Sequence, residues 1–505
     1  MLLVCAALGL MAILIRLALL PVLPIPNPIV QDEFSYLLGA DTFAHGRVTN
    51  PPHPLWVHFE TLHENMQPTY CSIYPPAQAV FLALGQVVLG NPWYGVVLSM
   101  GLMFAAICWM LHGWVAPRYA ITATVICILC WGLTGQWINS YWGGTVAAAA
   151  GALVIGAIPR LARQPAPAVA ATAAIGLIVL ANSRPFEGAL AAIAAAIVLW
   201  REVRRLKRPL ASLFTRGAIA ALAAILIPGA AAMAYYNYRT TGNALLFAHD
   251  SYTHAYEASP YFYMLPDHPP PQYRHDHIRR YWLDWVRAQY TEARSNPAKA
   301  ISVSAGFMWD FYFYTPIGLA MLAGLLFARN HTVGAALALA ALPILGAMCG
   351  VRALPHYIAP ICGAFVMIAA AGLQSVGQWT PGGRPIGPLL VMALCGVAFA
   401  AGARETAVQA LLAKHPPNTL GLRPVVIDRL RQMGGKHLVI VHYTPKHSVH
   451  EEWVYNAADI DGSDIVWAQD MGDRNRELFD YYRDRKAWVI QPDIDPLAVQ
   501  PYGLQ

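Results

Sequence analysis

Long apolar runs recur along most of the chain. Each extends over roughly 18 to 22 residues, the length that a helix needs to cross a hydrocarbon layer about 30 Å thick. The runs are rich in Leu, Ala, Ile and Val and do not alternate apolar with polar positions, so they predict helices rather than barrel strands. We expect about eleven membrane-spanning helices, at about 2–23, 92–115, 119–136, 142–159, 166–182, 186–200, 217–236, 306–328, 332–350, 354–376 and 386–402.

One further apolar run, at 75–89, is shorter and is followed by Gly90, Asn91 and Pro92. We interpret it as a helix on the membrane surface, because a span there would reverse the orientation of everything that follows. Charge supports this choice. With the N-terminus inside, the short inner loops carry eleven basic residues against one acid, whereas the short outer loops carry only Arg184 and Arg352.

Composition agrees with a membrane protein, since 57% of the 505 residues are hydrophobic and only 12% are charged. A chain of spanning helices without a barrel pattern is expected in a bacterial inner (plasma) membrane, with a cytoplasmic N-terminus. Most of the eight cysteines lie in or at the ends of apolar runs, so we expect no disulfide framework.

Polar chemistry gathers on the side predicted to be extracytoplasmic. Three large segments face this side, at about 24–91, about 237–305 and 403–505, and they hold 14 of the 17 histidines. Their charges are mixed in sign, which argues against nucleic acid as a partner.

The tail differs from the rest of the chain because it is charged and polar. It contains short strand-like runs at 438–442, 465–468 and 487–490, with an amphipathic helix pattern at 475–486. We therefore divide the chain into an all-α membrane domain, 1–402, and a small extracytoplasmic α/β domain, 403–505.

The adjacent acids Asp32 and Glu33 follow the first span and its proline-rich exit. Two carboxylates at the membrane surface, beside apolar and aromatic groups, are partly desolvated, which can make a carboxylate a useful general base. The alternative is a structural role, since acids also favour the first turn of a helix. From the residues alone, Asp32 and Glu33 are candidates either for a catalytic base or for this structural role.

The rest of this first loop offers candidates for binding an acceptor or a sugar, namely His53, His58, Glu60 and Tyr74. Glu60 and His63 stand three residues apart, a spacing that would put them on one helix face, as in some metal sites. A single such pair is weak evidence, so we expect no bound metal or other cofactor, with a divalent ion as the alternative.

A second motif lies at the outer end of a late span and contains Arg352, His356 and Tyr357. An arginine at the bilayer surface can bind phosphate through two hydrogen bonds, and the other two side chains can supply further donors. Arg184, in a short outer turn, either binds phosphate as well or pairs with Glu187. The alternative for the whole motif is an interfacial anchor of the kind that Arg and Tyr form.

The second large loop, 237–305, is rich in Tyr and Trp interleaved with His, Asp and Arg, including Arg274. Aromatic rings that stack on sugars, beside polar groups that bind hydroxyls, would form an acceptor or sugar site. The same composition also suits a loop that lies in the headgroup layer.

The order of these parts resembles the GT-C superfamily of membrane glycosyltransferases. The resembling features are a first span followed by Asp32-Glu33, a Tyr-Pro-Pro that enters a short apolar helix ending at Gly-Asn-Pro, and an Arg/His-Tyr-x-x-Pro segment at 352–360. The chain is most similar to the branch containing protein O-mannosyltransferases and the bacterial transferase that adds aminoarabinose to lipid A. This resemblance covers about 1–402.

The resemblance implies transfer of a sugar from a polyprenyl-phosphate donor to an acceptor on the extracytoplasmic side, with inversion. Asp32 would activate the acceptor, helped or positioned by Glu33, while Arg352, His356 and Tyr357 would face the donor phosphate. The acceptor would be a protein, a lipid or a polysaccharide, and the tail has no role in this assignment.

Two other classes of function stay open at this stage. A transporter or flippase for a lipid-linked or anionic substrate should carry charges near the middle of several spans, but these spans are nearly charge-free apart from Arg16. A non-catalytic membrane assembly subunit would use the tail to bind a partner.

Overall fold

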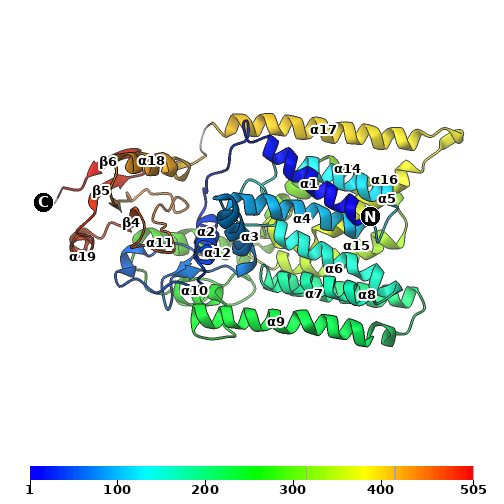
Figure 1. The fold of residues 1–505 in the computed structure, drawn as a ribbon, viewed down its shortest axis with the longest axis horizontal. Helices are drawn as coiled ribbons and strands as arrows, with labels where there is room; N and C mark the ends of the chain where they lie inside the picture. The colour runs from blue at the N-terminus through cyan, green and yellow to red at the C-terminus, as the bar shows by residue number, and fades with distance from the viewer. Residues whose placement is uncertain (314, 415–416, 504–505) are drawn as a thin grey trace.

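The computed structural model describes residues 1–313, 315–414 and 417–503. Most of these residues form helices that run roughly parallel to one another in a bundle, and the C-terminal segment forms a separate unit at the end of the bundle far from the N-terminus (Figure 1). Residues 314, 415–416 and 504–505 lie outside the described residues; residue 314 falls in the predicted span 306–328, and His415 is one of the histidines of the tail.

Helices from most of the length of the chain form the bundle. They are α1 (Leu2–Ala18), α4 (Trp93–Leu111), α5 (Pro117–Cys127), α6 (Thr145–Arg163), α7 (Pro167–Ala181), α8 (Pro185–Arg205), α9 (Arg216–Thr241), α13 (Pro297–Met308), α14 (Pro316–Phe327), α15 (His331–Met348), α16 (Cys362–Gly377) and α17 (Ile386–Leu412).

Local sequence signals set many of these boundaries. Proline occupies the first turn of α5, α7, α8, α13 and α14, where its missing N–H would have no helical partner in any case. Gly242 ends α9 in the left-handed conformation at φ 80°, which a residue with a Cβ rarely adopts. The helix breaks therefore follow from residue type rather than from hydropathy.

The prediction of about eleven spans is not confirmed. Among the described residues, six helices are long and apolar enough to cross a membrane: α4, α6, α9, α15, α16 with its preceding turn, and α17. A seventh exists if α13 and α14, which bend by 100° at their junction, count as one span. Three shorter apolar helices, Leu2–Ala18, Pro117–Gly132 and Pro167–Ala181, account for much of the difference, because the predicted spans extend beyond their helical residues.

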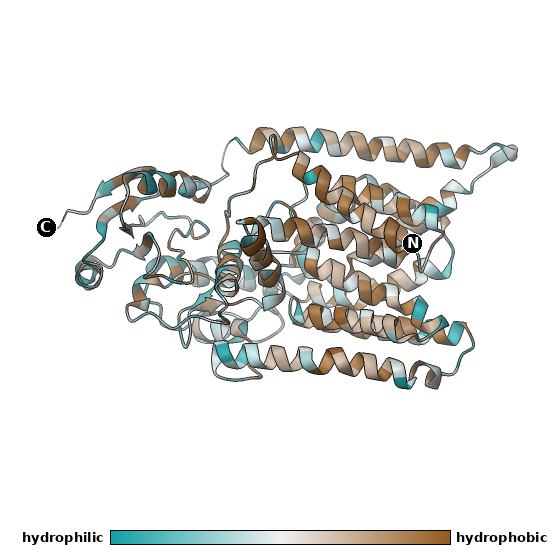
Figure 2. Cartoon of the chain, viewed as in Figure 1, coloured by the Kyte–Doolittle hydropathy of each residue, from teal (hydrophilic) through white to brown (hydrophobic). Residues whose placement is uncertain are grey.

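Two of the spanning helices lie at the edges of the bundle. Only 6% of the apolar window of α9 and 17% of that of α17 are buried, compared with 89% for Pro355–Gly377 in the core. Their exposed sides are predominantly hydrophobic (Figure 2). A bilayer is the solvent that such surfaces require. α17 also continues to Leu412, beyond the predicted end at 402.

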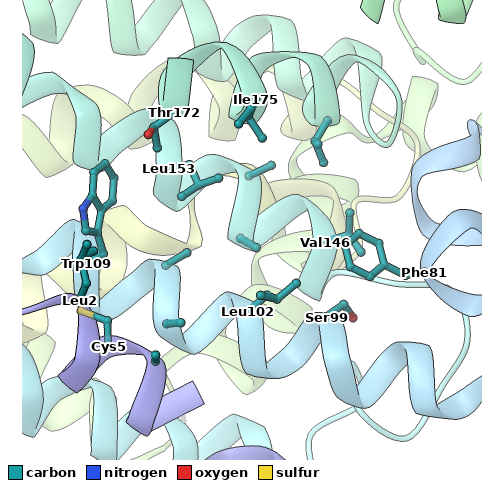
Figure 3. Close-up of a pocket in the computed structure, with 16 residues that line it drawn as sticks. Leu2, Cys5, Phe81, Ser99, Leu102, Trp109, Val146, Leu153, Thr172 and Ile175 are labelled. Carbon is teal, nitrogen blue, oxygen red and sulfur yellow. The ribbon is translucent and has the colours of Figure 1, made fainter. Parts of the chain in front are cut away.

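An apolar cavity of about 570 Å³ lies between α1, α4, α6 and α7 (Figure 3). Its lining includes Leu2, Trp109 and Ile175, and hydroxyl or thiol groups reach it from few positions. None of the predicted site residues lines this cavity, so it is no candidate for the predicted chemistry.

Basic loops lie at the end of the bundle that contains the N-terminus. Arg160 donates to the thioether of Met1 at 3.9 Å, and Arg208 donates to the carbonyl of Ala162, so these basic loops gather near the N-terminus. The large polar loops lie at the opposite end, between the bundle and the C-terminal unit (Figure 1). All the predicted polar sites therefore belong to one end.

The polar loops contain short elements between the bundle and the C-terminal unit. These are α2 (Gln31–Ala44), η1 (Trp56–Phe59), β1 (Glu64–Asn65), β2 (Cys71–Ser72), α3 (Pro76–Leu89), α10 (Ala248–Tyr256), α11 (Asp276–Arg280), η4 (Tyr281–Val286), α12 (Arg287–Ser295) and η6 (Pro355–Ile361). α3 has 14 residues, fewer than a span needs, and it ends at Gly90 with φ 73°.

The C-terminal unit contains the predicted small sheet, with strand order β4-β3-β5-β6. β3 (His437–Val441) pairs in parallel with β4 (Ile465–Gln469) and with β5 (Lys486–Gln491). An antiparallel edge strand, β6 (Asp495–Pro501), completes the sheet, and it was absent from the prediction. The unit also contains α18 (Arg423–Met433) and α19 (Asn475–Tyr481).

This unit docks directly onto α2. The ring of Phe34 stacks on that of Tyr455 at 4.1 Å and 3°, inside a cluster of buried apolar residues from the unit. Asp41 accepts a hydrogen bond from the backbone of Ala458 at 2.8 Å. One face of α2 is thus buried against the C-terminal unit, while α3 packs against α2 from the bundle side.

Candidate active site

Asp32 lies in the first turn of α2, and its side chain is 27% exposed. Its Oδ1 accepts a hydrogen bond from the hydroxyl of Tyr74 and lies 3.5 Å from Nδ1 of His63. His63 is held from its other side, where Nε2 is 3.2 Å from the hydroxyl of Tyr281. We call Asp32, His63, Tyr74 and Tyr281 the Asp32 cluster.

The surroundings of Asp32 favour its charged form. Burial would raise the pKa of this carboxyl, but the charge of His63 and the hydrogen bonds from His63 and Tyr74 outweigh it and lower the pKa to about 2. His356 contributes in the same direction. Asp32 is therefore a stable anion, and among the described residues its Oδ2 has no hydrogen-bond partner from the chain.

Glu33 has the opposite environment although it is the next residue. Its side chain is 2% exposed, and its two oxygens accept hydrogen bonds from the backbone N–H groups of Ile29, Val30 and Tyr141, at 2.8 to 3.3 Å. Burial outweighs these bonds and raises the pKa of Glu33 to about 7. Burial thus acts on both carboxyls, but it determines the direction of the pKa shift only for Glu33, which caps α2.

Two arginines lie near this cluster without a carboxylate partner. Arg184 is placed over the ring of Tyr357 at 4.9 Å, and Arg352 donates to Oε1 of Gln289 at 3.3 Å. Within the described parts of the chain, neither arginine forms an ion pair, and Nε of Arg352 is buried without a hydrogen-bond partner. Both arginines are half-buried, and a half-buried guanidinium without an anionic partner is suited to an anionic ligand.

Asp32 and these arginines belong to one neighbourhood. Tyr36, whose ring stacks on Tyr74 at 4.3 Å, has its pKa raised by burial, lowered by Arg184 and raised by Asp32. A half-buried side chain of the C-terminal unit, His450, similarly responds to Arg352 and to Asp32. Tyr36 and His450 thus each lie close enough to Asp32 and to one of the two arginines for both charges to affect their pKa.

The motif at 352–360 is folded so that its members face this neighbourhood. η6 (Pro355–Ile361) places the ring of His356 against Trp142 at 5.1 Å and against Tyr357 at 4.8 Å. The hydroxyl of Tyr261, from the second large loop, donates to the carbonyl of Arg352 at 3.4 Å. Arg184 and His356 thus both contact Tyr357, and Arg352 joins them through Tyr261, whose ring lies 6.1 Å from that of Tyr357.

The other predicted acceptor-site residues lie elsewhere, against the C-terminal unit. His53 pairs with Asp461 at 3.0 Å, and His58 pairs with Glu477 at 3.2 Å. Among the described residues, neither forms a hydrogen bond or ion pair with Asp32. These two histidines join the first loop to the C-terminal unit, and of the predicted acceptor residues Tyr74 is the one that contacts Asp32.

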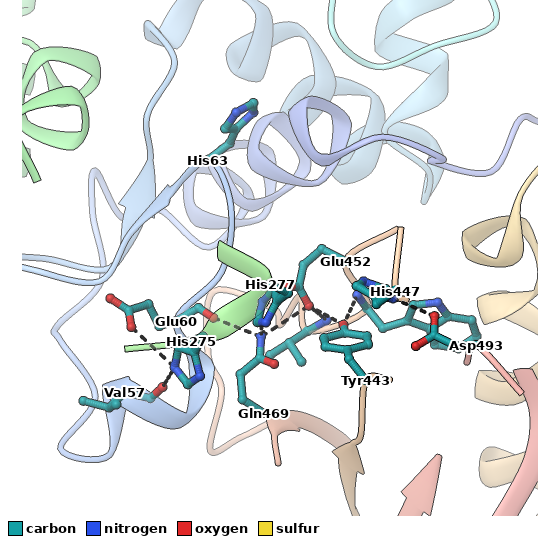
Figure 4. Close-up of polar contacts among 12 residues, drawn as sticks. Val57, Glu60, His63, His275, His277, Tyr443, His447, Glu452, Gln469 and Asp493 are labelled. Atoms are coloured by element: carbon teal, nitrogen blue, oxygen red, sulfur yellow. Dashed lines mark hydrogen bonds and ion pairs between the residues drawn. The ribbon is translucent and has the colours of Figure 1, made fainter. Parts of the chain in front are cut away.

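Glu60 and Arg274 also have partners in the loops. Glu60 accepts hydrogen bonds from Tyr256 at 2.6 Å and from Arg274 at 3.1 Å, and its other oxygen lies 3.4 Å from His275 (Figure 4). Burial raises the pKa of Glu60. The chain around Glu60 and His63 is not helical, so the proposed shared helix face for a metal does not form.

The sequence interpretation missed His63 as part of the site. His63 adopts φ 62°, a left-handed conformation that costs a residue with a side chain about 1–3 kcal/mol and is frequent at functional sites. Its backbone N–H donates to the hydroxyl of Tyr252 at 2.9 Å, which helps to hold this conformation. In the sequence, only the Glu60–His63 spacing drew attention to His63. That spacing suggested a metal shared with Glu60, whereas the structure pairs His63 with Asp32.

In the described part of the chain, one group of three potential metal ligands occurs, formed by Cys5, Cys108 and His112 on α1 and at the end of α4. It contains none of the predicted site residues.

Comparisons with known proteins found similar folds only. No family model and no curated protein matches the chain. The chain is similar to ArnT from Cupriavidus metallidurans bound to undecaprenyl phosphate, at 12% identity and a TM-score of 0.49, over 95% of this chain and 92% of that one. It is also similar to the oligosaccharyltransferase of Archaeoglobus fulgidus in complex with Zn and sulfate, at 12% identity and a TM-score of 0.47.

That second likeness covers 86% of this chain and 60% of the oligosaccharyltransferase. AglB from Archaeoglobus fulgidus, in complex with an inhibitory peptide and a dolichol-phosphate, follows at 10% identity and a TM-score of 0.41, over 86% and 62% of the two chains. Because every TM-score is below 0.5, no residue role passes from these structures to this chain. The structural neighbours are members of the GT-C superfamily, which the loop motifs of the chain resemble.

Proposed function

We propose that the protein is a membrane glycosyltransferase that moves a sugar from a polyprenyl-phosphate donor to an acceptor on the extracytoplasmic side, with inversion. One observation carries the proposal: an ionised, partly exposed Asp32 lies in the same neighbourhood as two arginines that form no ion pair with any described residue. Displacement of a sugar from a phosphate requires a base for the attacking hydroxyl and cations that stabilise the leaving phosphate.

In this reaction Asp32 acts on the acceptor. Its free Oδ2 accepts a hydrogen bond from the acceptor hydroxyl, whose oxygen forms the new bond to the anomeric carbon of the sugar. As that bond forms, the hydroxyl proton passes to Oδ2. His63 and Tyr74 hold Oδ1 and so fix the direction of the other oxygen. Glu33 contributes by capping α2, which positions Asp32.

The donor phosphate leaves on the arginine side. The bond between the anomeric carbon and the phosphate oxygen breaks, and its electron pair remains on that oxygen. Arg184 and Arg352 stabilise the developing charge, with His356 and Tyr357 as further donors in the same neighbourhood. A phosphate leaving group needs cationic stabilisation more than a proton, so a separate general acid is unnecessary.

Replacement of Asp32 by Asn tests this function. In membranes supplied with a labelled polyprenyl-phosphate sugar, we expect Asp32→Asn to lower transfer by about 10²- to 10⁴-fold, the usual contribution of a general base. Binding of the donor lipid should persist. Asp284→Asn, at an exposed position on η4, is the control and should transfer at the wild-type rate.

The same experiment separates the alternatives. A non-catalytic assembly subunit would be indifferent to Asp32→Asn, and a flippase would move lipid without transferring sugar. Arg16, the charged residue inside the first apolar helix, is fully buried and donates to the carbonyl of Leu23 and to Asn139, both at 3.0 Å. Its hydrogen bonds are internal, so it offers no support for a transport pathway.

A further inference from the structure

The C-terminal unit sends one loop into the neighbourhood of the Asp32 cluster. This loop, residues 442–464, connects β3 to β4, and His450 lies in its middle. The imidazole of His450 packs edge-on against the ring of Trp285, with 4.5 Å between centroids and 85° between planes. Its centroid is 6.1 Å from that of Tyr281, the residue whose hydroxyl contacts His63.

Several contacts hold this loop in place. The carboxylate of Glu452, two residues after His450, lies 2.6 Å from Nε2 of His277 on α11, and both side chains are buried (Figure 4). Glu451 accepts hydrogen bonds from the backbone and hydroxyl of Thr419. Arg280 donates to the carbonyl of Pro445 at 2.7 Å. The backbone around His450 is therefore fixed from both sides.

The contact of Glu452 with His277 also lowers the pKa of Glu452. Burial would raise the pKa of Glu452, but the charge and hydrogen bond of His277 and the hydroxyl of Tyr443 lower it to about 2. His447, three residues before His450, pairs with Asp493 at 2.7 Å. The neighbours of His450 in the loop thus have internal partners.

His450 itself is the exception. Across the described residues, neither of its ring nitrogens has a hydrogen-bond partner, although the ring is half buried. Four charged groups affect its pKa. Arg352 lies just before η6, Glu451 lies in the same loop as His450, His63 lies in the first loop, and Asp32 lies on α2. Burial and then Arg352 lower its pKa, and Glu451 and Asp32 raise it.

We propose that His450 and Arg352 bind the same phosphate group of the lipid donor, so that the C-terminal unit completes the donor site. His450 packs on Trp285, and Gln289, four residues after Trp285, accepts a hydrogen bond from the guanidinium of Arg352 at 3.3 Å. The imidazole and the guanidinium therefore lie along one short stretch of chain, and each can supply a donor to the same phosphate. The assignment rests on the proposed transferase function and adds to it a residue from a unit to which the sequence assigned no role.

Direct binding tests the assignment without any transfer assay. The protein is placed in lipid nanodiscs, and the affinity for undecaprenyl phosphate is measured. We expect His450→Ala to weaken binding about tenfold, the factor that the loss of one hydrogen bond to a charged group produces. His450→Gln, which keeps a donor, should recover most of the affinity, whereas His450→Phe, which keeps packing on Trp285, should not.

His442→Ala is the matched control, because His442 lies at the start of the same loop and pairs with Asp470 on the outer surface. It should bind like the wild type. A second measurement uses diethyl pyrocarbonate, which modifies free imidazoles. Undecaprenyl phosphate should protect His450 from modification and leave His442 unprotected.

The outcomes separate the two proposals. If the wild type binds undecaprenyl phosphate but His450→Ala matches His442→Ala and His450 is not protected, the role of His450 is wrong and the transferase function stands. Recovery by Phe rather than by Gln would likewise show packing instead of phosphate binding. If the wild type binds no undecaprenyl phosphate, both proposals fail.

Discussion

Two groups of histidine–carboxylate pairs occur in the polar region, and they differ in what surrounds them. His277–Glu452, His53–Asp461 and His58–Glu477 join the loops to the C-terminal unit. The Asp32–His63 pair also joins distant segments, but Oδ2 of Asp32 has no partner among the described residues. In Glu452, Asp461 and Glu477, by contrast, both carboxylate oxygens have partners. The same residue types therefore build a joint in one place and a candidate reactive group in the other.

The difference shows why a residue pair alone does not indicate chemistry. In the joint, the carboxylate oxygens are already occupied by partners from the chain, and in the buried His277–Glu452 pair each charge lowers the cost of burying the other. In the Asp32 cluster, Tyr74 contacts Oδ1 of Asp32 and Tyr281 contacts Nε2 of His63, which leaves Oδ2 of Asp32 without a partner among the described residues. The following experiments alter each region separately.

The largest effect should come from breaking the joint at Glu452. Glu452→Ala leaves His277 buried without its anion, which should reduce the free energy of unfolding by roughly 3–5 kcal/mol. Thermal unfolding in detergent and trypsin cleavage at the junction before α18 would measure it. Glu477→Ala removes a more exposed partner and is the control. Equal effects of the two variants would show that burial of the pair does not matter.

Glu33 tests the structural half of the Asp32–Glu33 pair. Glu33→Gln turns an amide N–H₂ toward a backbone N–H, so we expect a loss of roughly 1–3 kcal/mol in stability. Because burial raises the pKa of Glu33 from 4.5 to about 7, its protonation stabilises the fold fully below about pH 4.5, and this contribution is lost as the pH rises through about 7.

The unfolding temperature of the wild type should therefore decline between about pH 5 and about pH 8 more than that of Glu33→Gln. Parallel pH profiles for the two proteins would contradict the assigned protonation. Donor binding in Glu33→Gln should change only as far as α2 is displaced.

His63 tests the reactive half of the comparison. His63→Gln removes the charge that lowers the pKa of Asp32, while burial still raises it, so the acid limb of the rate profile should move to higher pH. Transfer at neutral pH should fall about 10- to 100-fold, since Asp32 loses its orienting partner. Measuring kcat/KM against pH for both proteins decides this, and an unmoved acid limb would contradict the role of His63.

The smallest effect should come from an exposed pair. His442 and Asp470 lie 2.6 Å apart, but the histidine side chain is 47% exposed. His442→Ala should change stability by less than about 1 kcal/mol, because exposed pairs contribute little. Transfer should be unchanged. A large loss of either would mean that the outer surface of the C-terminal unit takes part in function.

Part of this molecule follows from local sequence alone. Apolar runs, proline at helix starts and Gly90 after α3 predict where helices lie, because burial and backbone geometry act over a few residues. The polar end of the bundle and the strands β3, β4 and β5 were predicted for the same reason. The span count was not, since hydropathy does not show where a helix breaks inside an apolar run.

The assignment of roles required the tertiary structure. Asp32 and Glu33 are adjacent and chemically similar, yet one contacts His63 and the other the backbone of Tyr141, 108 positions away. His53 and His58 meet partners more than 400 positions away, and His450 reaches Trp285 across the interface with the C-terminal unit. Local patterns set which segments are helical and which are polar, but pKa and partner depend on contacts between segments that only packing brings together.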